Sequence, residues 1–154
     1  MRLIPWIAVP LFSVPLAGVA AEEEPRVPVV LRHAGSDLVG LALSVALRDE
    51  LGGAAFLRLD AEPLANPRIT VIVATVDGSV EEPEKQTASS VNVLYDADSL
   101  PANGYLITAM VQVCGITRTY ECAREIVATV EAALGKLKAD HPDLWESLRQ
   151  ANGG

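Results

Sequence analysis

The chain has 154 residues, of which 50% are hydrophobic and 5% aromatic, and its 20 acidic residues outnumber its 12 lysines and arginines. This length suits one domain with a modest core and excludes a large multidomain enzyme. A net charge of −8, with no run of basic residues, argues against nucleic acid as a partner.

Residues 1–21 have the layout of a secretory signal peptide. Arg2 is the only charge before Glu22, and an apolar stretch leads to the small residues Val19-Ala20-Ala21, which a signal peptidase accepts. A retained membrane anchor is the alternative, because the 19 uncharged residues approach the roughly 20 that span a bilayer. Three prolines within the stretch oppose a helical anchor. We therefore expect cleavage after Ala21, a periplasmic or secreted protein, and no stable membrane insertion afterwards.

The remaining chain divides into an extended N-terminal segment, residues 22–35, a single α+β domain, residues 36–150, and a frayed C-terminus, residues 151–154. Because Pro28 cannot donate to a central ladder, we expect the extended segment to end in an edge strand. Arginine outnumbers lysine nine to three, which fits a GC-rich bacterial genome and hence a protein of the bacterial envelope.

The first helix is predicted from Ser36 to Leu51. Ser36 or Asp37 can cap its start, and Gly52-Gly53 can end it. The periodicity assigns the core face to a group of aliphatic residues, namely Leu38, Leu41, Ala42 and Val45, widened by Leu43 and Leu47.

Three or four strands follow the first helix. Residues 55–59 are a short candidate, and residues 68–77 are apolar on both faces, which predicts a central strand. Residues 88–95 and 105–114 alternate, and the segment between them, with Pro101 and Asn103-Gly104, predicts a hairpin. The polar residues 78–86 predict a mobile loop.

Two helices end the chain. The first begins near Tyr120 and stops at Asp140-His141-Pro142, and the second covers residues 142–149 with Leu144, Trp145 and Leu148 as its docking face. The predicted order is helix, strands, long helix, short helix. We expect a two-layer α+β sandwich, with a mainly antiparallel sheet of three or four strands and both long helices on one face.

Cys114 and Cys122 are predicted to form a structural disulfide, because exported proteins with an even cysteine count usually pair them. A redox-active pair is the first alternative, although the spacing is longer than Cys-x-x-Cys. A soft-metal site with His33, His141 or Met110 is the second, although no ligand pair shows a metal-binding spacing.

The sequence predicts no catalytic residue, cofactor or metal ligand. His33 and His141 are expected in exposed loops, and no nucleophile elbow, phosphate-binding loop or zinc motif occurs. The acidic residues Asp77, Glu81, Glu82 and Glu84 are expected to form a solvated loop, with weak Ca²⁺ binding as the alternative.

Arg118 and Tyr120, in the loop that the disulfide would close, are the predicted interaction residues, and Tyr105 is a weaker candidate of the same kind. The first functional hypothesis is a noncatalytic interaction or accessory module that binds a basic envelope protein, in one form as an inhibitor or immunity protein. The alternatives are a small-ligand carrier and a small hydrolase whose site is assembled from distant residues.

Overall fold

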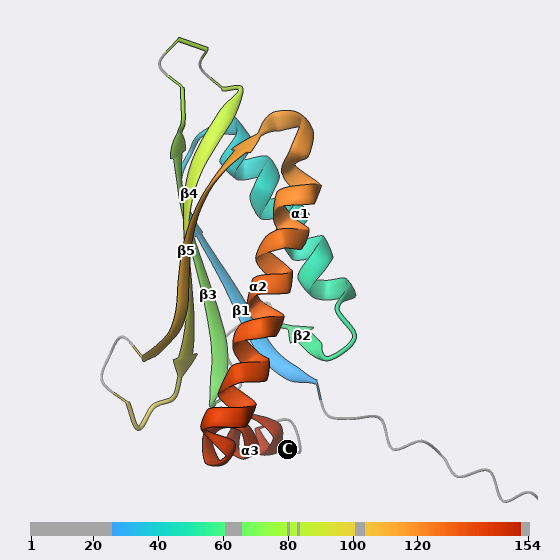
Figure 1. The fold of residues 1–154 in the computed structure, drawn as a ribbon, viewed down its shortest axis with the longest axis vertical. Helices are drawn as coiled ribbons and strands as arrows, with labels where there is room; N and C mark the ends of the chain where they lie inside the picture. The colour runs from blue at the N-terminus through green and yellow to red at the C-terminus, as the bar shows by residue number, and fades with distance from the viewer. Residues whose placement is uncertain (1–25, 61–65, 80, 83, 101–103, 152–154) are drawn as a thin grey trace, which may run out of the picture.

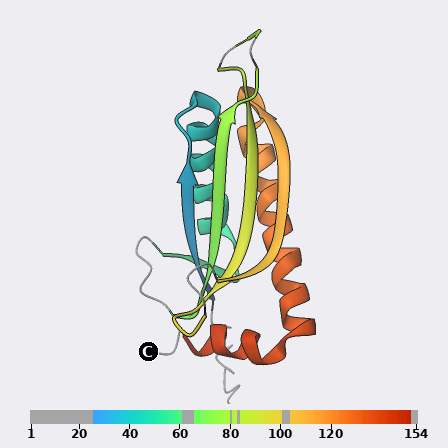
Figure 2. The ribbon, with the colours of Figure 1, turned by 90° about the vertical axis from the view of Figure 1, so that its left-hand side faces the viewer.

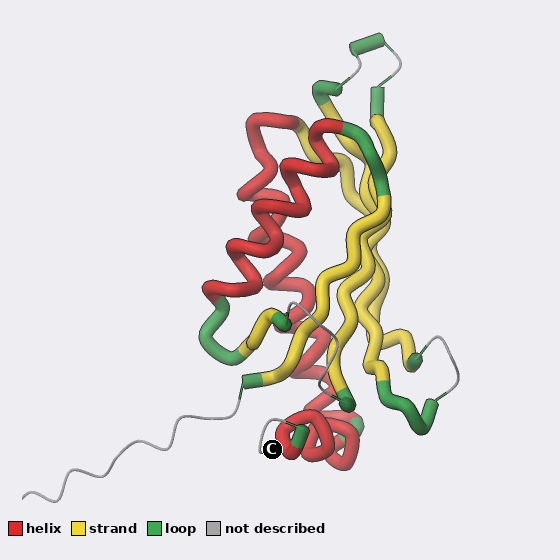
Figure 3. The backbone as a smooth tube through the Cα atoms, turned by 180° about the vertical axis from the view of Figure 1, so that it is seen from behind, coloured by secondary structure: helices red, strands yellow, loops and turns green. Residues whose placement is uncertain are grey.

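The computed structural model describes residues 26–60, 66–79, 81–82, 84–100 and 104–151. The predicted signal peptide and the last three residues lie outside these ranges. A sheet forms one layer and the helices form the other, as Figures 1 and 3 show from opposite sides. No helix in these ranges is long and apolar enough to cross a membrane.

The elements follow the predicted order, and a strand within residues 22–35 precedes the first helix. They are β1 (Val27–Ala34), α1 (Leu38–Gly53), β2 (Leu57–Leu59), β3 (Arg68–Asp77), β4 (Gln86–Asp96), β5 (Tyr105–Gly115), the single-turn helix η1 (Ile116–Arg118), α2 (Thr119–Asp140) and α3 (Pro142–Gln150).

The sheet is mixed and has five strands in the order β2-β1-β3-β4-β5. β1 runs parallel to β2 and β3, whereas β4 runs antiparallel to both of its neighbours, β3 and β5. The prediction of a mainly antiparallel sheet of three or four strands was therefore wrong. Its premise, that closely spaced strands are joined by hairpins, holds for β3 to β5. It does not hold for β1, because α1 carries the chain across the sheet and returns it parallel.

β1 is an internal strand and not the predicted edge strand. Val27 N donates to Phe56 O, and Val29 O accepts from Asp60 N, so both residues direct these groups toward β2. Because backbone groups alternate along a strand, Pro28 turns its nitrogen toward the β3 side. The β1–β3 ladder begins only at the next residue, with Val29 opposite Ile69. The proline therefore costs no ladder hydrogen bond.

α1 buries a different face from the one its periodicity indicated. Leu38, Leu41 and Val45, predicted for the core, are 49%, 46% and 56% exposed. The face that packs against the sheet consists of Val39, Gly40, Leu43, Ala46, Leu47 and Leu51. Gly40 lies on this face, and a Cβ there would collide with the Thr75 side chain, so the helix approaches β3 closely at that point.

The core lies between the helices and one face of the sheet. Ile69, Val71 and Val73 of β3 are completely buried, as is Ile126 of α2. Leu148 closes the lower end of the core from α3, with Leu144 and Trp145 half-buried beside it. None of the helices that the structure describes lies on the opposite face of the sheet, as Figure 2 shows. β3 is central, as predicted, but only one of its two apolar faces is covered.

Candidate functional site

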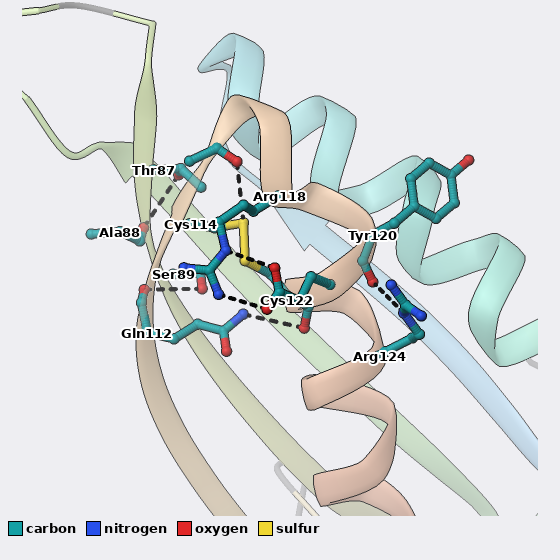
Figure 4. The surroundings of a disulfide bond; sticks show 11 residues. Thr87, Ala88, Ser89, Gln112, Cys114, Arg118, Tyr120, Cys122 and Arg124 are labelled. Atoms are coloured by element: carbon teal, nitrogen blue, oxygen red, sulfur yellow. Dashed lines mark hydrogen bonds and ion pairs between the residues drawn. A yellow bond between two sulfur atoms is a disulfide. The ribbon is translucent and has the colours of Figure 1, made fainter.

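The loop between β5 and α2 is closed by a disulfide between Cys114 and Cys122, whose Cα atoms are 6.2 Å apart (Figure 4). We call residues 115–121 the stapled loop. Both cysteines are buried, at 0% and 3% exposure, within the main core. Because thiol exchange requires access to a sulfur atom, this position fits a structural bond and not a redox-active one.

Arg118, a predicted interaction residue, is engaged within the stapled loop. Its Nε donates to Glu121 Oε2 at 2.7 Å and its Nη2 to Glu121 Oε1 at 2.9 Å (Figure 4). This hydrogen-bonded pairing raises the pKa of Arg118 and lowers the pKa of Glu121. The Arg118 guanidinium is therefore exposed to solvent, but its Nε and Nη2 donors are already bound to Glu121. The Arg-x-x-Glu spacing at the start of a helix could have indicated this pair from the sequence.

Tyr120, the second predicted residue, points from α2 toward α1 (Figure 4). Its hydroxyl donates to Asp49 Oδ2 at 2.8 Å, and this hydrogen bond, together with the carboxylate charge, raises the pKa of Tyr120. Half of the side chain is exposed. The phenol is thus anchored at its polar end while its ring still faces solvent.

The exposed side of α1 continues this surface. Asp49 follows Val45 by four residues and so lies one turn further along the same side of the helix. Leu38 and Leu41 occupy the preceding turns of that side. We call Leu38, Leu41, Val45 and Tyr120 the helical stripe, an apolar surface whose members are each about half exposed.

Tyr105 lies far from the helical stripe. It begins β5, whereas the disulfide lies at the other end of that strand, about 30 Å away at the rise of an extended chain. Its ring packs edge to face on His141, with centroids 5.9 Å apart. The structure therefore separates Tyr105 from the other two candidates.

His33, expected in an exposed loop, instead lies near the end of β1 and is half buried. Its Nε2 is 3.0 Å from the hydroxyl of Thr75, a residue of β3 that is 4% exposed. Glycines 35 and 40 close over that hydroxyl, since a Cβ at either position would collide with it. This arrangement pairs a half-buried histidine with a hydroxyl that the protein itself covers.

Asp37 completes the same buried polar cluster. Its Oδ1 accepts from the Gly40 amide at 2.7 Å and caps α1, while Oδ2 is buried without a fully aligned donor. Burial alone would raise the pKa of Asp37, but the hydroxyls of Thr75 and Thr87 and the Gly40 amide lower it overall. The cluster is a polar clamp between α1 and the sheet, and the sequence analysis missed it because its residues are far apart along the chain.

A hollow of about 390 Å³ lies on the uncovered face of the sheet. Arg32, Asn92 and Asp96 contribute polar groups to it, and Leu94 and Leu106 contribute apolar ones. The Asp96 carboxylate already accepts from Arg68 at 2.7 Å. The hollow can therefore take a small polar group beside an apolar one.

Among the residues described, no group of three or more His, Cys, Asp or Glu could hold a metal ion. The acidic loop after β3 uses the Asp77 carboxylate internally, to accept from the amides of Ser79 and Glu84.

Neither the protein-family models nor the curated proteins contain a match to this chain. The assignment of a function therefore depends on the exposed surfaces.

Proposed function

We propose that this chain is an exported, noncatalytic interaction module of the bacterial envelope, whose protein partner binds the helical stripe. The observation that carries the proposal is the gathering of four half-exposed apolar side chains on one side of the molecule. Contiguous apolar patches on small proteins usually mark interaction surfaces. Tyrosine is enriched among the residues that dominate binding energy, and Tyr120 is held in place by Asp49.

The charge of the chain favours a basic partner. Asp49 and Glu50 border the stripe on α1, and the whole chain carries −8. Such a field attracts a cationic protein over a distance and raises the association rate at low salt. An inhibitor or immunity protein for a secreted cationic enzyme is one form of this function.

The disulfide supports export. Disulfides persist in oxidising compartments such as the periplasm, and Cys114 and Cys122 are bonded here. Cleavage of residues 1–21 would release the chain into that compartment.

Affinity capture from envelope extract tests the proposed function. The purified protein should retain a basic protein at low salt and release it as NaCl is raised. Val45→Asp should abolish retention, because it places a charge in the middle of the stripe. Arg118→Ala should retain the partner, because that guanidinium is already bound to Glu121.

The matched control is Val111→Asp, which makes the same change on the uncovered face of the sheet, where Val111 is 77% exposed. This variant should retain the partner. If the purified protein retains no protein that an unrelated acidic protein does not also retain, the proposal is wrong. Equal retention of the partner by Val45→Asp and the wild type would also contradict it.

A small-ligand carrier is the second candidate, and the hollow beside Arg32 favours it because its volume lies in the range of ligand pockets. Native mass spectrometry of the purified protein would show a retained small molecule. The hydrolase alternative gains no support from His33, because the Thr75 hydroxyl beside it is buried.

A further inference from the structure

A small pocket lies at the lower end of the molecule, where α3 follows the end of α2 (Figure 2). Its volume is about 270 Å³, just below the roughly 300 Å³ at which pockets for drug-sized ligands begin. Residues of β1, α2 and α3 line it, together with Phe56 from the turn before β2. We call it the α2–α3 pocket. It shares no lining residue with the hollow beside Arg32.

The walls of the α2–α3 pocket are apolar. Val27 and Leu134 are each 1% exposed and belong to the core behind it. Phe56 and Trp145 are partly buried and pack against the same core. The amide of Val27 donates to the carbonyl of Phe56 at 2.8 Å, which fixes one wall to β1. Hydrophobic and aromatic walls of this kind are typical of sites for small molecules.

Gly135 leaves space in the pocket on the α2 side. It lies within the 22-residue helix, four positions after Glu131 and three before Lys138, so these residues share one side of α2. A Cβ at Gly135 would meet no atom within 4 Å, so packing does not require a glycine there. After proline, glycine is the least favourable residue in a helix interior. The structural effect of this unfavourable residue is therefore the space that it leaves in the pocket.

Three charged side chains, Lys138, Arg149 and Glu131, also line the pocket. Lys138 Nζ lies 5.5 Å from the centroid of the Trp145 ring, a cation–π contact that holds the ammonium group close to the aromatic wall. Neither Lys138 nor Arg149 belongs to an ion pair within the described residues. Two cations thus face one carboxylate, in a chain whose net charge is −8. The charge of the pocket favours an anion, although the whole protein is acidic.

We propose that the α2–α3 pocket binds a small organic anion, a carboxylate on a flat apolar body. The body packs against Phe56 and Trp145, and the carboxylate accepts from Lys138 and Arg149. Charge-assisted hydrogen bonds of this kind are stronger than neutral ones. The site does not depend on the proposed function, because Tyr120 of the helical stripe lies 18 positions before Lys138 along α2, about 27 Å at the rise of a helix.

Nuclear magnetic resonance titration of the purified, ¹⁵N-labelled protein with 2-naphthoate tests the site. Trp145 is the one tryptophan outside the predicted signal peptide, so its indole resonance reports on the pocket. 2-Naphthoate should shift this resonance and saturate at one molecule per chain. The neutral analogue 2-naphthamide should bind at least about tenfold more weakly, because it forms no charge-assisted hydrogen bond. The cationic analogue 2-naphthylmethylamine should not bind.

Gly135→Leu should abolish binding of 2-naphthoate, because its side chain fills the pocket. Circular dichroism should show native helix content, since leucine favours a helix more than glycine does. The matched control is Gly52→Leu on α1, where a Cβ also meets no atom within 4 Å and which does not line the pocket. This variant should bind 2-naphthoate as the wild type does.

Lys138→Gln and Arg149→Gln test the charge. Each should weaken 2-naphthoate several-fold and leave the affinity for 2-naphthamide unchanged. A pocket damaged by the substitution would lose both probes, so this difference separates a contact with the carboxylate from a structural role. Added NaCl should weaken 2-naphthoate alone, because salt screens exposed charges.

A wild type that shows no saturable binding of 2-naphthoate would overturn the site and leave the proposed function intact. Equal affinities for the three probes would overturn the anionic ligand. Binding that survives Gly135→Leu and is lost with Arg32→Gln would place the probe in the hollow on the sheet, which also overturns the proposal. If Gly135→Leu fails to fold, the two glutamine variants still decide.

Discussion

The two faces of the sheet are built from similar residues and have opposite environments. Val73 lies on the face that the helices cover and is completely buried, whereas Val111 lies on the other face and is 77% exposed. Strand patterning shows that a side chain prefers to leave water, but it does not show what will cover it. An apolar strand face that none of the described elements covers is therefore a sign of association.

The covered face is also the one with specific polar and covalent links. Asp37 and Thr75 join α1 to β3, and the disulfide joins β5 to α2. The difference between the two faces can be measured by making equivalent changes on each.

The largest effect should come from placing a charge on each face. Val73→Asp should lower the free energy of unfolding by about 4 kcal/mol or more, because it buries an unpaired carboxylate in the core. Val111→Asp should change it by less than about 0.5 kcal/mol. Urea unfolding followed by circular dichroism, at a concentration where the chain is monomeric, measures both. Equal losses for the two variants would mean that the faces do not differ as described.

Removal of the disulfide should have the next largest effect. The double variant Cys114→Ser, Cys122→Ser should lose on the order of 2 to 3 kcal/mol, because the bond restricts a short loop in the unfolded chain. The same urea experiment measures the loss. The wild type treated with reductant provides a second way to break the disulfide, without a substitution. Titration of the denatured, unreduced protein should find no free thiol. Two titratable thiols would show that the disulfide between β5 and α2 does not form.

Asp37→Asn should have a smaller effect that depends on pH. Asparagine caps a helix as well as aspartate does, so only the contribution of the charge is lost. At neutral pH the cost should be about 0.3 to 1 kcal/mol, the usual value of a negative charge at a helix N-terminus. The pKa of Asp37 is lowered on folding, so its contribution is complete above the ordinary value of 3.8 and is lost as the pH falls through the lowered pKa. Urea unfolding at neutral and at strongly acidic pH should therefore show the two proteins converging in acid. A constant difference would show that the Asp37 charge is not stabilised by folding.

Much of the fold could be predicted from local pattern. The bounds of β3 agree with the prediction, and β4 and β5 extend it by only one or two residues at each altered end. Continuous β-branched runs and simple alternation leave few other interpretations for these segments. The long helix α2 was also evident, because its apolar residues follow a single 3.6-residue stripe.

α1 and β1 were harder because local pattern was ambiguous or misleading. α1 is apolar around most of its circumference, so periodicity could not choose between the side with Leu43 and the side with Leu41. The buried side is the one with Leu43 and Gly40, and the close approach at Gly40 involves Thr75, far away in the chain. For β1, Pro28 suggested an edge strand, because proline cannot donate a ladder hydrogen bond. Pro28 lies one residue before the β1–β3 ladder begins, so an internal position costs no hydrogen bond.

The candidate site was predicted only in part. The stapled loop was located from cysteine spacing, and Tyr120 lies on the apolar surface that we assign to a partner. Arg118 was predicted to bind a partner because its guanidinium can donate two hydrogen bonds, but it donates them to Glu121 within the same loop. The helical stripe could not have been found, because it consists mostly of residues that the periodicity had assigned to the core.

The place of β1 also sets an order of assembly. β1 precedes both of its neighbours in the chain, and its contact with β3 joins His33 to a residue 42 positions later. Strands β3, β4 and β5 are connected by adjacent hairpins, which close with little loss of chain entropy. β1 can pair with β2 as soon as α1 and β2 are made, but its longer ladder waits for β3. A chain halted before β3 is complete would therefore leave the β3 side of β1 unpaired, and exposed strand edges of this kind are prone to aggregation.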